Sequence, residues 1–242
     1  MKAMVFAAGL GTRLQNETSA KPKALVEVAG KPLLFHAIEK LRNAGIKEVV
    51  INVHHYAEQV IEYVNKTNFG VKINISDERN LLLETGGGLK KAAHFFSNNE
   101  PILIYNVDIL SNINFSLLLS EHLKSGALAT LAVRKRETQR YFKFDSEKNL
   151  VGWINKKTGE TKISQPDAFA AGVEMAFSGI HISSPEIFSL MPPAERFSIT
   201  DLYLELAKTK VIRGYFDDSG IWIDVGKPEQ LEEARRIFGE TT

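Results

Sequence analysis

The sequence predicts an α/β fold built on a mostly parallel mixed sheet with helices on both faces. Strand-like and helix-like patterns alternate through the first half of the chain, with short connections between them. Several of the strand-like runs are continuously apolar, as is typical of strands that are covered on both faces. Alternation of this kind produces right-handed βαβ units, so neighbouring strands are expected to run parallel.

The first half of the chain contains the regular alternation. A buried strand is expected in "KAMVFAA" and a helix in "LLFHAIEKLRNAG", which stops at Gly45. The apolar face of that helix consists of Leu33, Leu34, Ala37, Ile38 and Leu41. The elements expected next are the strand "KEVVINVHH", the helix "AEQVIEYVNK", the strand "VKINIS", the helix "GGLKKAAHFF" and the buried strand "PILIYNVD".

From about residue 126 the pattern becomes rich in strands. The runs "ALATLAVRK", "YFKFD", "LVGWIN" and "FSGIHIS" indicate a β-rich lobe over residues 126–180, in which the polar residues 155–169 predict an exposed loop. Helical patterns follow in "SPEIFSLM" and "TDLYLELAKTK", then the strand "GIWIDVG" and the helix "PEQLEEARRIF". Because no linker-like segment interrupts the chain, residues 1–242 are expected to form a single domain.

Composition limits the classes of function. The 242 residues are enough to bury a sizeable core, and a formal net charge of +1 argues against binding nucleic acid through an overall basic surface. The absence of cysteine excludes disulfides and thiolate catalysis. No run of 18 apolar residues occurs, and the first apolar stretch is too short for a signal peptide. We therefore expect a cytoplasmic protein with neither a membrane nor a nucleic-acid partner.

Glycines and cations follow the first strand in "GLGTRLQNETSAKPKAL". Backbone N–H groups at such a junction bind anions, and Gly9 and Gly11 would let the backbone approach one closely. The loop is not a dinucleotide fingerprint, because Leu14 stands where the third glycine is needed, and both Gly-Lys pairs run into proline rather than completing a Walker loop. A structural turn is the alternative, but Arg13 and Lys23 make phosphate binding the preferred interpretation.

Two further features favour a ligand site. Three glycines in "ETGGGLKKA" precede a helical pattern, as expected where a flat ligand lies against bare backbone, with a bulge or a hinge as the alternative. Asp108 and Asp224 each follow an apolar strand, although either could instead cap the next segment. Two carboxylates on adjacent strand ends favour one divalent cation, and Mg²⁺ bound through carboxylates and substrate phosphates is the usual arrangement.

The motifs "AAGLGTRL", "KPKALVEVAGKPL", "NVDIL", "FSGIHI" and "WIDVGKPEQLEEA" together resemble the sugar-1-phosphate nucleotidyltransferase family over essentially the whole chain. Within it, the short form and "ETGGGL" resemble the N-acetylmuramate-1-phosphate uridylyltransferases most, and then the mannose-1-phosphate guanylyltransferases. The resemblance implies a Rossmann-like fold of the nucleotide-diphospho-sugar transferase type, without a C-terminal β-helix domain. It also implies Mg²⁺ as cofactor, an NTP and a sugar 1-phosphate as partners, and a UDP- or GDP-sugar as product for cell-wall or polysaccharide synthesis. A homo-oligomer is compatible with this family.

The resemblance also assigns roles to residues. It implies that nucleotide contacts come from Ala8, Gly9, Gly11 and Thr12 in the first loop and from Glu84, Thr85, Gly86 and Gly87 near the base. Arg13 and Lys23 match the cations that act on the phosphates, and Asp108 and Asp224 match the metal-binding aspartates. Gly179 matches a position on the strand beside which the sugar phosphate lies.

The chain departs from the family pattern at several positions. Val107 stands next to the first metal-binding aspartate, where the family has glycine. The sugar-phosphate lysine of the family has no clear match, and Lys143, Lys156 and Lys157 are the candidates. The adjacent histidines at positions 54 and 55 are expected to be structural, because neighbouring strand residues face opposite ways. Residues 77–79 are expected to form a solvated turn.

The expected reaction is attack by an oxygen of the sugar 1-phosphate on the α-phosphorus of the NTP, with release of pyrophosphate. It depends on positioning and electrostatics, because the nucleophile is already an anion. Two other functions stay open on the sequence alone. A regulatory protein could bind NDP-sugar without catalysis, and a phosphocholine cytidylyltransferase could use Tyr141, Phe142 and Trp153 as a cage for choline.

Overall fold

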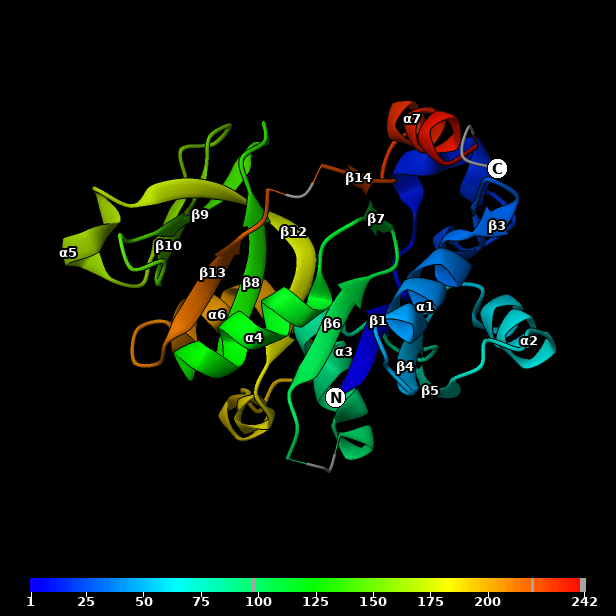
Figure 1. Cartoon of the computed structure of the whole chain (residues 1–242), viewed down its shortest axis with the longest axis horizontal. Helices are drawn as coiled ribbons and strands as arrows, with labels where there is room; N and C mark the ends of the chain where they lie inside the picture. The colour runs from blue at the N-terminus through cyan, green and yellow to red at the C-terminus, as the bar shows by residue number, and fades with distance from the viewer. Residues whose placement is uncertain (97–98, 219, 240–242) are drawn as a thin grey trace.

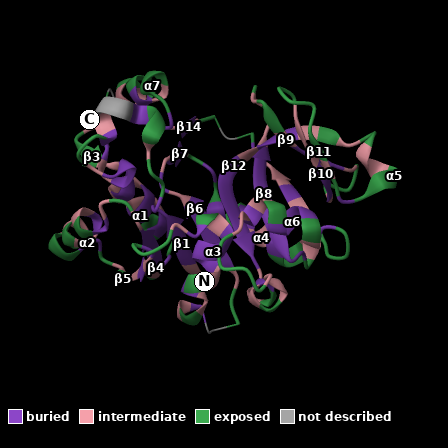
Figure 2. Ribbon diagram, turned by 180° about the vertical axis from the view of Figure 1, so that it is seen from behind, coloured by how far each residue is buried: buried purple, intermediate pink, exposed green. Residues whose placement is uncertain are grey.

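The parallel part of the fold lies where the alternating sequence pattern predicts it. The computed structural model describes residues 1–96, 99–218 and 220–239. Across the sheet, the parallel strands stand in the order β6 (Ile102–Asn106), β1 (Lys2–Phe6), β4 (Glu48–Val53) and β5 (Lys72–Asp77). Alternate residues of each strand face opposite sides, so Ala3 and Val5 enter one hydrophobic core and Met4 the other. Strands β1, β4 and β6 are almost entirely buried, whereas β5 at the edge of the sheet is partly exposed (Figure 2).

The second half of the sheet is mostly antiparallel. The long strand β12 (Val173–Ser183) pairs with β6 through residues 180–183 and with β9 (Arg140–Phe144) through residues 173–175. The remaining strands are β8 (Ala129–Arg134), β10 (Leu150–Asn155), β11 (Thr161–Ile163) and β13 (Ile212–Phe216). Within the described residues, these strands form one ten-stranded sheet of order β11-β10-β9-β12-β6-β1-β4-β5, with β8 joined to β12 and β13 joined to β8 (Figure 1). The prediction of an α/β fold with a mixed sheet is therefore confirmed.

Helices cover both faces of the sheet (Figure 1). On one face lie α1 (Leu33–Asn43), α2 (Ala57–Lys66), α4 (Phe115–Ser125) and α7 (Pro228–Gly239). On the other lie α3 (Glu84–Lys91) and α6 (Ile199–Leu206). The five apolar residues predicted for one face of α1 are all buried. Shorter elements are α5 (Pro166–Phe169) and the 3-10 helices η1 (Thr12–Thr18), η2 (Lys23–Leu25), η3 (Ala92–Phe95) and η4 (Pro185–Leu190).

Some elements differ from the expectation. Helix α4 was not predicted. It is capped at its start by Asn114, whose side chain accepts the N–H groups of Ser116 and Leu117, and at its end by Gly126. The prediction of an exposed loop over residues 155–169 was wrong in part, because that stretch contains β11, paired with β10, and α5. Backbone pairing at the edge of a sheet needs no apolar side chains, so polarity did not reveal the strand.

Two small sheets complete the fold. Strands β2 (Glu27–Val28) and β3 (Lys31–Pro32) form a short antiparallel pair, and so do β7 (Ile109–Ser111) and β14 (Trp222–Asp224). The second pair returns the end of the chain to the edge where β6 terminates, and α7 lies beside it (Figure 1). Among the helices of the described residues, none has the length and hydropathy required to cross a bilayer.

Candidate active site

Two cavities open at the edge of the sheet where the parallel strands end, which is where α/β sheets bind ligands. The smaller, of about 390 Å³, is lined by residues that follow β1, β4, β5 and β6 and by the start of α3. The larger, of about 870 Å³, is lined mainly by residues of the segment 136–162 together with Arg13, Asp224 and Lys227. Ser198 lines both cavities, so a single segment separates them.

The smaller cavity collects six of the residues that the sequence singles out. They are Ala8, Gly9, Lys23, Glu84, Thr85 and Asp108. The loop after β1 is held at this cavity by the N–H of Ala7, which donates to Asn52 Oδ1 over 2.8 Å. Residues 6–9 therefore form one wall of the smaller cavity, and the ion pair of Lys23 and Asp108 forms part of another wall.

The remaining residues of the glycine loop shape its path. Gly11 adopts a left-handed φ of 67°, and its carbonyl accepts the hydroxyl of Thr18 and the N–H of Leu14. These bonds turn the chain into η1, which carries Arg13 away from the smaller cavity and into the larger one. Gly11 and Thr12 line neither cavity.

Lys23, Asp108 and Asp224 form a charged centre at the border of the cavities. Lys23 is only 7% exposed, and its Nζ forms an ion pair with Asp108. The pairing of β14 with β7 brings Asp224 alongside, and the N–H of Val225 donates to the Asp108 carbonyl over 2.9 Å. Burial and then the Asp108 carboxylate raise the pKa of Asp224, against the opposing effects of the cations Lys23, Arg13 and Arg136.

This centre fits a hard divalent cation. Within the described chain, the buried Oδ1 of Asp224 has no hydrogen-bond partner, and two carboxylates face the same region. Among the described residues, no three or more histidine, cysteine or acidic side chains cluster in a way that could bind a metal. A cation here would therefore rely on two carboxylates plus oxygens from substrate phosphates, which is the coordination that Mg²⁺ favours.

The glycines of "ETGGGL" have a different role from the one expected. They lie inside α3 rather than before it, and the N–H groups of Gly86 and Gly87 donate to the carbonyl of Phe197. A Cβ on Gly87 would lie 2.0 Å from the carbonyl oxygen of Glu195, so glycine is required for the close approach of residues 195–197. The interpretation that a flat ligand covers bare backbone at Gly87 was wrong, because another segment of the protein covers it.

Glu84 and Thr85, by contrast, stand at the smaller cavity. Glu84 has a φ of 62° and accepts a hydrogen bond from Arg196 Nε over 3.0 Å. The hydroxyl of Thr85 accepts the N–H of Ile199 and so ties the start of α3 to the start of α6. Both residues keep the segment around Ser198 in place between the two cavities.

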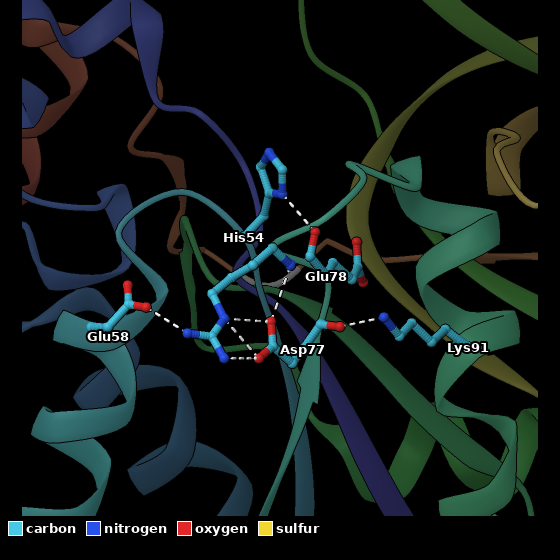
Figure 3. Close-up of polar contacts among 6 residues, drawn as sticks. His54, Glu58, Asp77, Glu78 and Lys91 are labelled. Carbon is cyan, nitrogen blue, oxygen red and sulfur yellow. Dashed lines mark hydrogen bonds and ion pairs between the residues drawn. The ribbon is translucent and has the colours of Figure 1, made fainter.

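The prediction of a solvated turn at residues 77–79 was wrong for its central residue. Arg79 is exposed and forms an ion pair with the partly exposed Asp77, and Arg79 also pairs with Glu58 (Figure 3). Glu78 instead points inward, is 1% exposed and lines the smaller cavity. His54 contacts the Glu78 carbonyl through Nδ1 over 2.7 Å, in accord with a structural role for this histidine (Figure 3).

Glu78 is an acidic residue of this cavity that the sequence motifs did not predict. Its Oε1 accepts a hydrogen bond from Asn52 Nδ2 over 2.8 Å, and its buried Oε2 has no partner among the described residues. Burial is the largest influence and raises the pKa of the Glu78 carboxyl, although Asn52 and the backbone N–H of Leu83 stabilise the charged form. The Glu78 carboxyl and the Asn52 amide thus give the smaller cavity polar groups that a ligand can contact.

The candidate sugar-phosphate lysines do not line the larger cavity. Lys143 is buried with its Nζ 3.4 Å from the carbonyl of Ala170, and Lys156 pairs with Glu174. Gly179 is buried within β12 against the side chain of Asn106 and lines neither cavity. The cations that do line the larger cavity are Arg13, Arg136, Arg140, Lys162 and Lys227.

Known proteins resemble this chain along its length. The family model of the nucleotidyl transferases matches residues 2–240. An N-acetylmuramate alpha-1-phosphate uridylyltransferase of Caulobacter vibrioides is 34% identical over 247 residues, which cover 98% of this chain and 97% of that protein. A mannose-1-phosphate guanyltransferase of Yarrowia lipolytica is 32% identical over 238 residues, which cover 96% of this chain but only 62% of that relative.

The fold is also shared with solved structures. The crystal structure of HddC from Yersinia pseudotuberculosis, complexed with GMP-PN, has a TM-score of 0.79 to this chain at 24% sequence identity. The match covers 98% of this chain and 99% of HddC. At this identity the likeness establishes the nucleotide-diphospho-sugar transferase fold.

The raised pKa of Glu78 gives a prediction about stability. The folded protein binds the Glu78 proton more tightly than the unfolded chain does, so ionised Glu78 destabilises the fold once the pH is above its folded pKa. This cost is absent below the unfolded pKa. We expect the difference in Tm between Glu78→Gln and the wild type to become more positive as the pH rises from about 4 to about 8.

Asp77→Asn is the matched control, because hydrogen bonding to Arg79 lowers the pKa of Asp77. Its Tm difference from the wild type should become more negative over the same pH range, by a smaller amount because solvent screens the partly exposed Asp77. Calorimetric unfolding of the three proteins measures both trends. A Tm difference for Glu78→Gln that stays constant or falls as the pH rises would contradict the destabilising role of the ionised carboxylate.

The close approach at Gly87 gives a second prediction. Gly87→Ala should lower the free energy of unfolding by about 1–3 kcal/mol, because the added methyl group must displace backbone rather than a flexible side chain. Gly220→Ala is the control, since a Cβ at Gly220 would meet nothing within 4 Å. Urea unfolding of both variants tests this, and equal stabilities would show that the segment 195–197 can move at little cost.

Proposed function

The chain belongs to the nucleotidyl transferase family, and on this basis we propose that it transfers a nucleoside monophosphate from an NTP to a sugar 1-phosphate, releasing pyrophosphate and forming an NDP-sugar. The observation that carries the proposal is the meeting of two cavities at Asp108 and Asp224, with Lys23 and Arg13 on either side. The two named relatives are a uridylyltransferase and a guanyltransferase, each acting on a sugar 1-phosphate.

In this proposal the smaller cavity takes the nucleoside. Backbone of residues 7–9 supplies a close wall, and a base seated there would meet the side chains of Asn52 and Glu78. The larger cavity takes the sugar, because its lining combines Trp153 with many polar groups. Most of that lining comes from the β-rich lobe at residues 126–180, which we propose as the sugar side of one nucleotidyltransferase domain.

The reaction requires two polyanions to be brought together. An oxygen of the sugar phosphate attacks the α-phosphorus, and the bond from that phosphorus to the bridging oxygen breaks, so that pyrophosphate leaves with the electron pair. Lys23, fixed by its ion pair with Asp108, offsets charge beside the nucleotide, and Arg13 offers a planar fork to phosphate oxygens from the larger cavity. No general base is needed, since the attacking oxygen is already ionised.

Asp108 and Asp224 are the residues that would hold Mg²⁺. When bound, such a cation supplies positive charge between the phosphates and polarises the phosphorus centre. The two aspartates keep their orientation without it, because the backbone bond between Val225 and Asp108 and the pairing of β7 with β14 position them.

Transfer to phosphocholine is less well supported. A choline cage needs aromatic faces around one point. Tyr141 does not line the larger cavity, and its hydroxyl accepts the N–H of Thr138 instead. Lys162 lies over the ring of Trp153 at 5.4 Å, so that face already carries a cation. A silent NDP-sugar sensor is also disfavoured, because the three residues of the charged centre and Arg13 are all present.

The roles of the charged residues can be tested by substitution. We expect Asp108→Asn and Arg13→Ala each to lower kcat by about 10²-fold or more, because each removes charge that acts on the transition state. Asp218→Asn is the matched control, since Asp218 is exposed and lines neither cavity. Thermal unfolding should confirm that the variants fold, and wild-type turnover in either active-site variant would exclude the proposed role.

The substrates can be identified by a matrix of four NTPs against a panel of sugar 1-phosphates, with phosphocholine included. Pyrophosphate release is the readout, with Mg²⁺ present and then removed by chelation. The proposal expects release with at least one sugar 1-phosphate, and loss of release on chelation. Release with phosphocholine alone, or with no acceptor at all, would overturn it.

A further inference from the structure

Arg136 occupies an unusual position in the larger cavity. It lies in the connection between β8 and β9 and is half-buried. Its guanidinium stands 4.4 Å from the centre of the Trp222 ring, and its Nη2 donates to the carbonyl of Phe177 over 3.1 Å. Trp222 is itself fixed, because its Nε1 donates to the carbonyl of Ser178 over 3.0 Å. The plane of the guanidinium is thus held by stacking and by one hydrogen bond.

Among the described residues, no carboxylate pairs directly with Arg136. The charge of Asp224 acts on it from a greater distance, and the Arg136 Nε is buried without a hydrogen-bond partner. Lys162, in the same cavity, pairs with Asp201 over 2.6 Å. A half-buried cation with an unused donor is costly unless an anion completes it. The arrangement is therefore typical of a site that awaits an anionic ligand.

We propose that Arg136 binds the phosphate of the sugar 1-phosphate, an inference that rests on the function proposed above. A guanidinium presents donors in a planar fork that matches phosphate oxygens. Arg136 lines the cavity of Trp153 and Asn155 and does not line the nucleoside cavity, so it faces the second substrate. Lys143, Lys156 and Lys157 were the predicted candidates for this cation, but none of them lines the cavity. Arg136 supplies the cation instead.

The position of Arg136 also suits the reaction. Its charge acts on Asp224, so the two groups share one region of the cavity. A phosphate held by Arg136 would therefore lie next to the aspartate centre where the nucleotide's α-phosphate is expected. The stacked, hydrogen-bonded guanidinium would restrict the phosphate to few orientations, which lowers the entropic cost of reaching the transition state.

The test uses three variants. Arg136→Gln removes the charge, Arg136→Lys keeps the charge without the fork, and Lys135→Gln removes a charge from the neighbouring exposed residue, which does not line the cavity. Calorimetry measures the affinity for inorganic phosphate in protein already saturated with UTP or GTP, so that the nucleotide site is filled. A separate titration measures the affinity for the NTP alone, which also reports that each variant is folded.

We expect phosphate affinity to fall by about 10- to 100-fold in Arg136→Gln, and by less in Arg136→Lys, as befits a charge-assisted hydrogen bond. Affinity in Lys135→Gln and NTP affinity in all three variants should match the wild type. In turnover, KM for the sugar 1-phosphate should rise in Arg136→Gln while KM for the NTP does not change.

Two results would overturn the assignment. One is unchanged phosphate affinity in Arg136→Gln, and the other is a loss of NTP affinity as large as the loss of phosphate affinity, which would make Arg136 part of the triphosphate site. The binding result does not depend on turnover. If no sugar 1-phosphate yields pyrophosphate, the proposed function fails, whereas Arg136-dependent binding of phosphate still identifies the anion site.

Discussion

The charged centre of Lys23, Asp108 and Asp224 depends on one backbone pairing, that of β14 with β7. It places Asp224 beside Asp108, two carboxylates whose charges repel, and the N–H of Val225 locks the arrangement through the Asp108 carbonyl. The neighbouring cations make this possible, because Lys23 pairs with Asp108 and both Arg13 and Arg136 act on Asp224. These cations thus offset the repulsion between the two carboxylates, which would be unfavourable without them.

The division into two cavities follows from the same construction. Residues 195–198 run between the starts of α3 and α6, receive the N–H groups of Gly86 and Gly87, and present Ser198 to both sides. Arg13 and Lys23 belong to one loop but face different cavities, since η1 carries the chain across the border between them. A single loop therefore supplies one cation to each of the two cavities.

Much of this arrangement could be predicted from sequence, and the failures have physical causes. The apolar face of α1 and the acid after β6 follow from local periodicity and strand direction, which a chain displays in its residues. Glu78 does not, because its burial depends on how β5 pairs with β4 and brings it beside Asn52. The glycines of α3 correctly indicated a close approach to the backbone, but a local sequence pattern does not distinguish a ligand from another backbone segment. Arg136 belongs to no motif, and only the stacking on Trp222 singles it out.

Backbone hydrogen bonds join Phe197, next to Ser198, to the start of α3, whereas side chains of β9, β10 and the connections beside them line the larger cavity. Strands β10 and β11 also lie at one end of the sheet, remote from the strands β1, β4 and β6 beside the smaller cavity. Under the proposed function, substitutions on β10 and β11 would alter the acceptor sugar without disturbing the binding of the NTP. The two ends of the sheet could then change independently of each other.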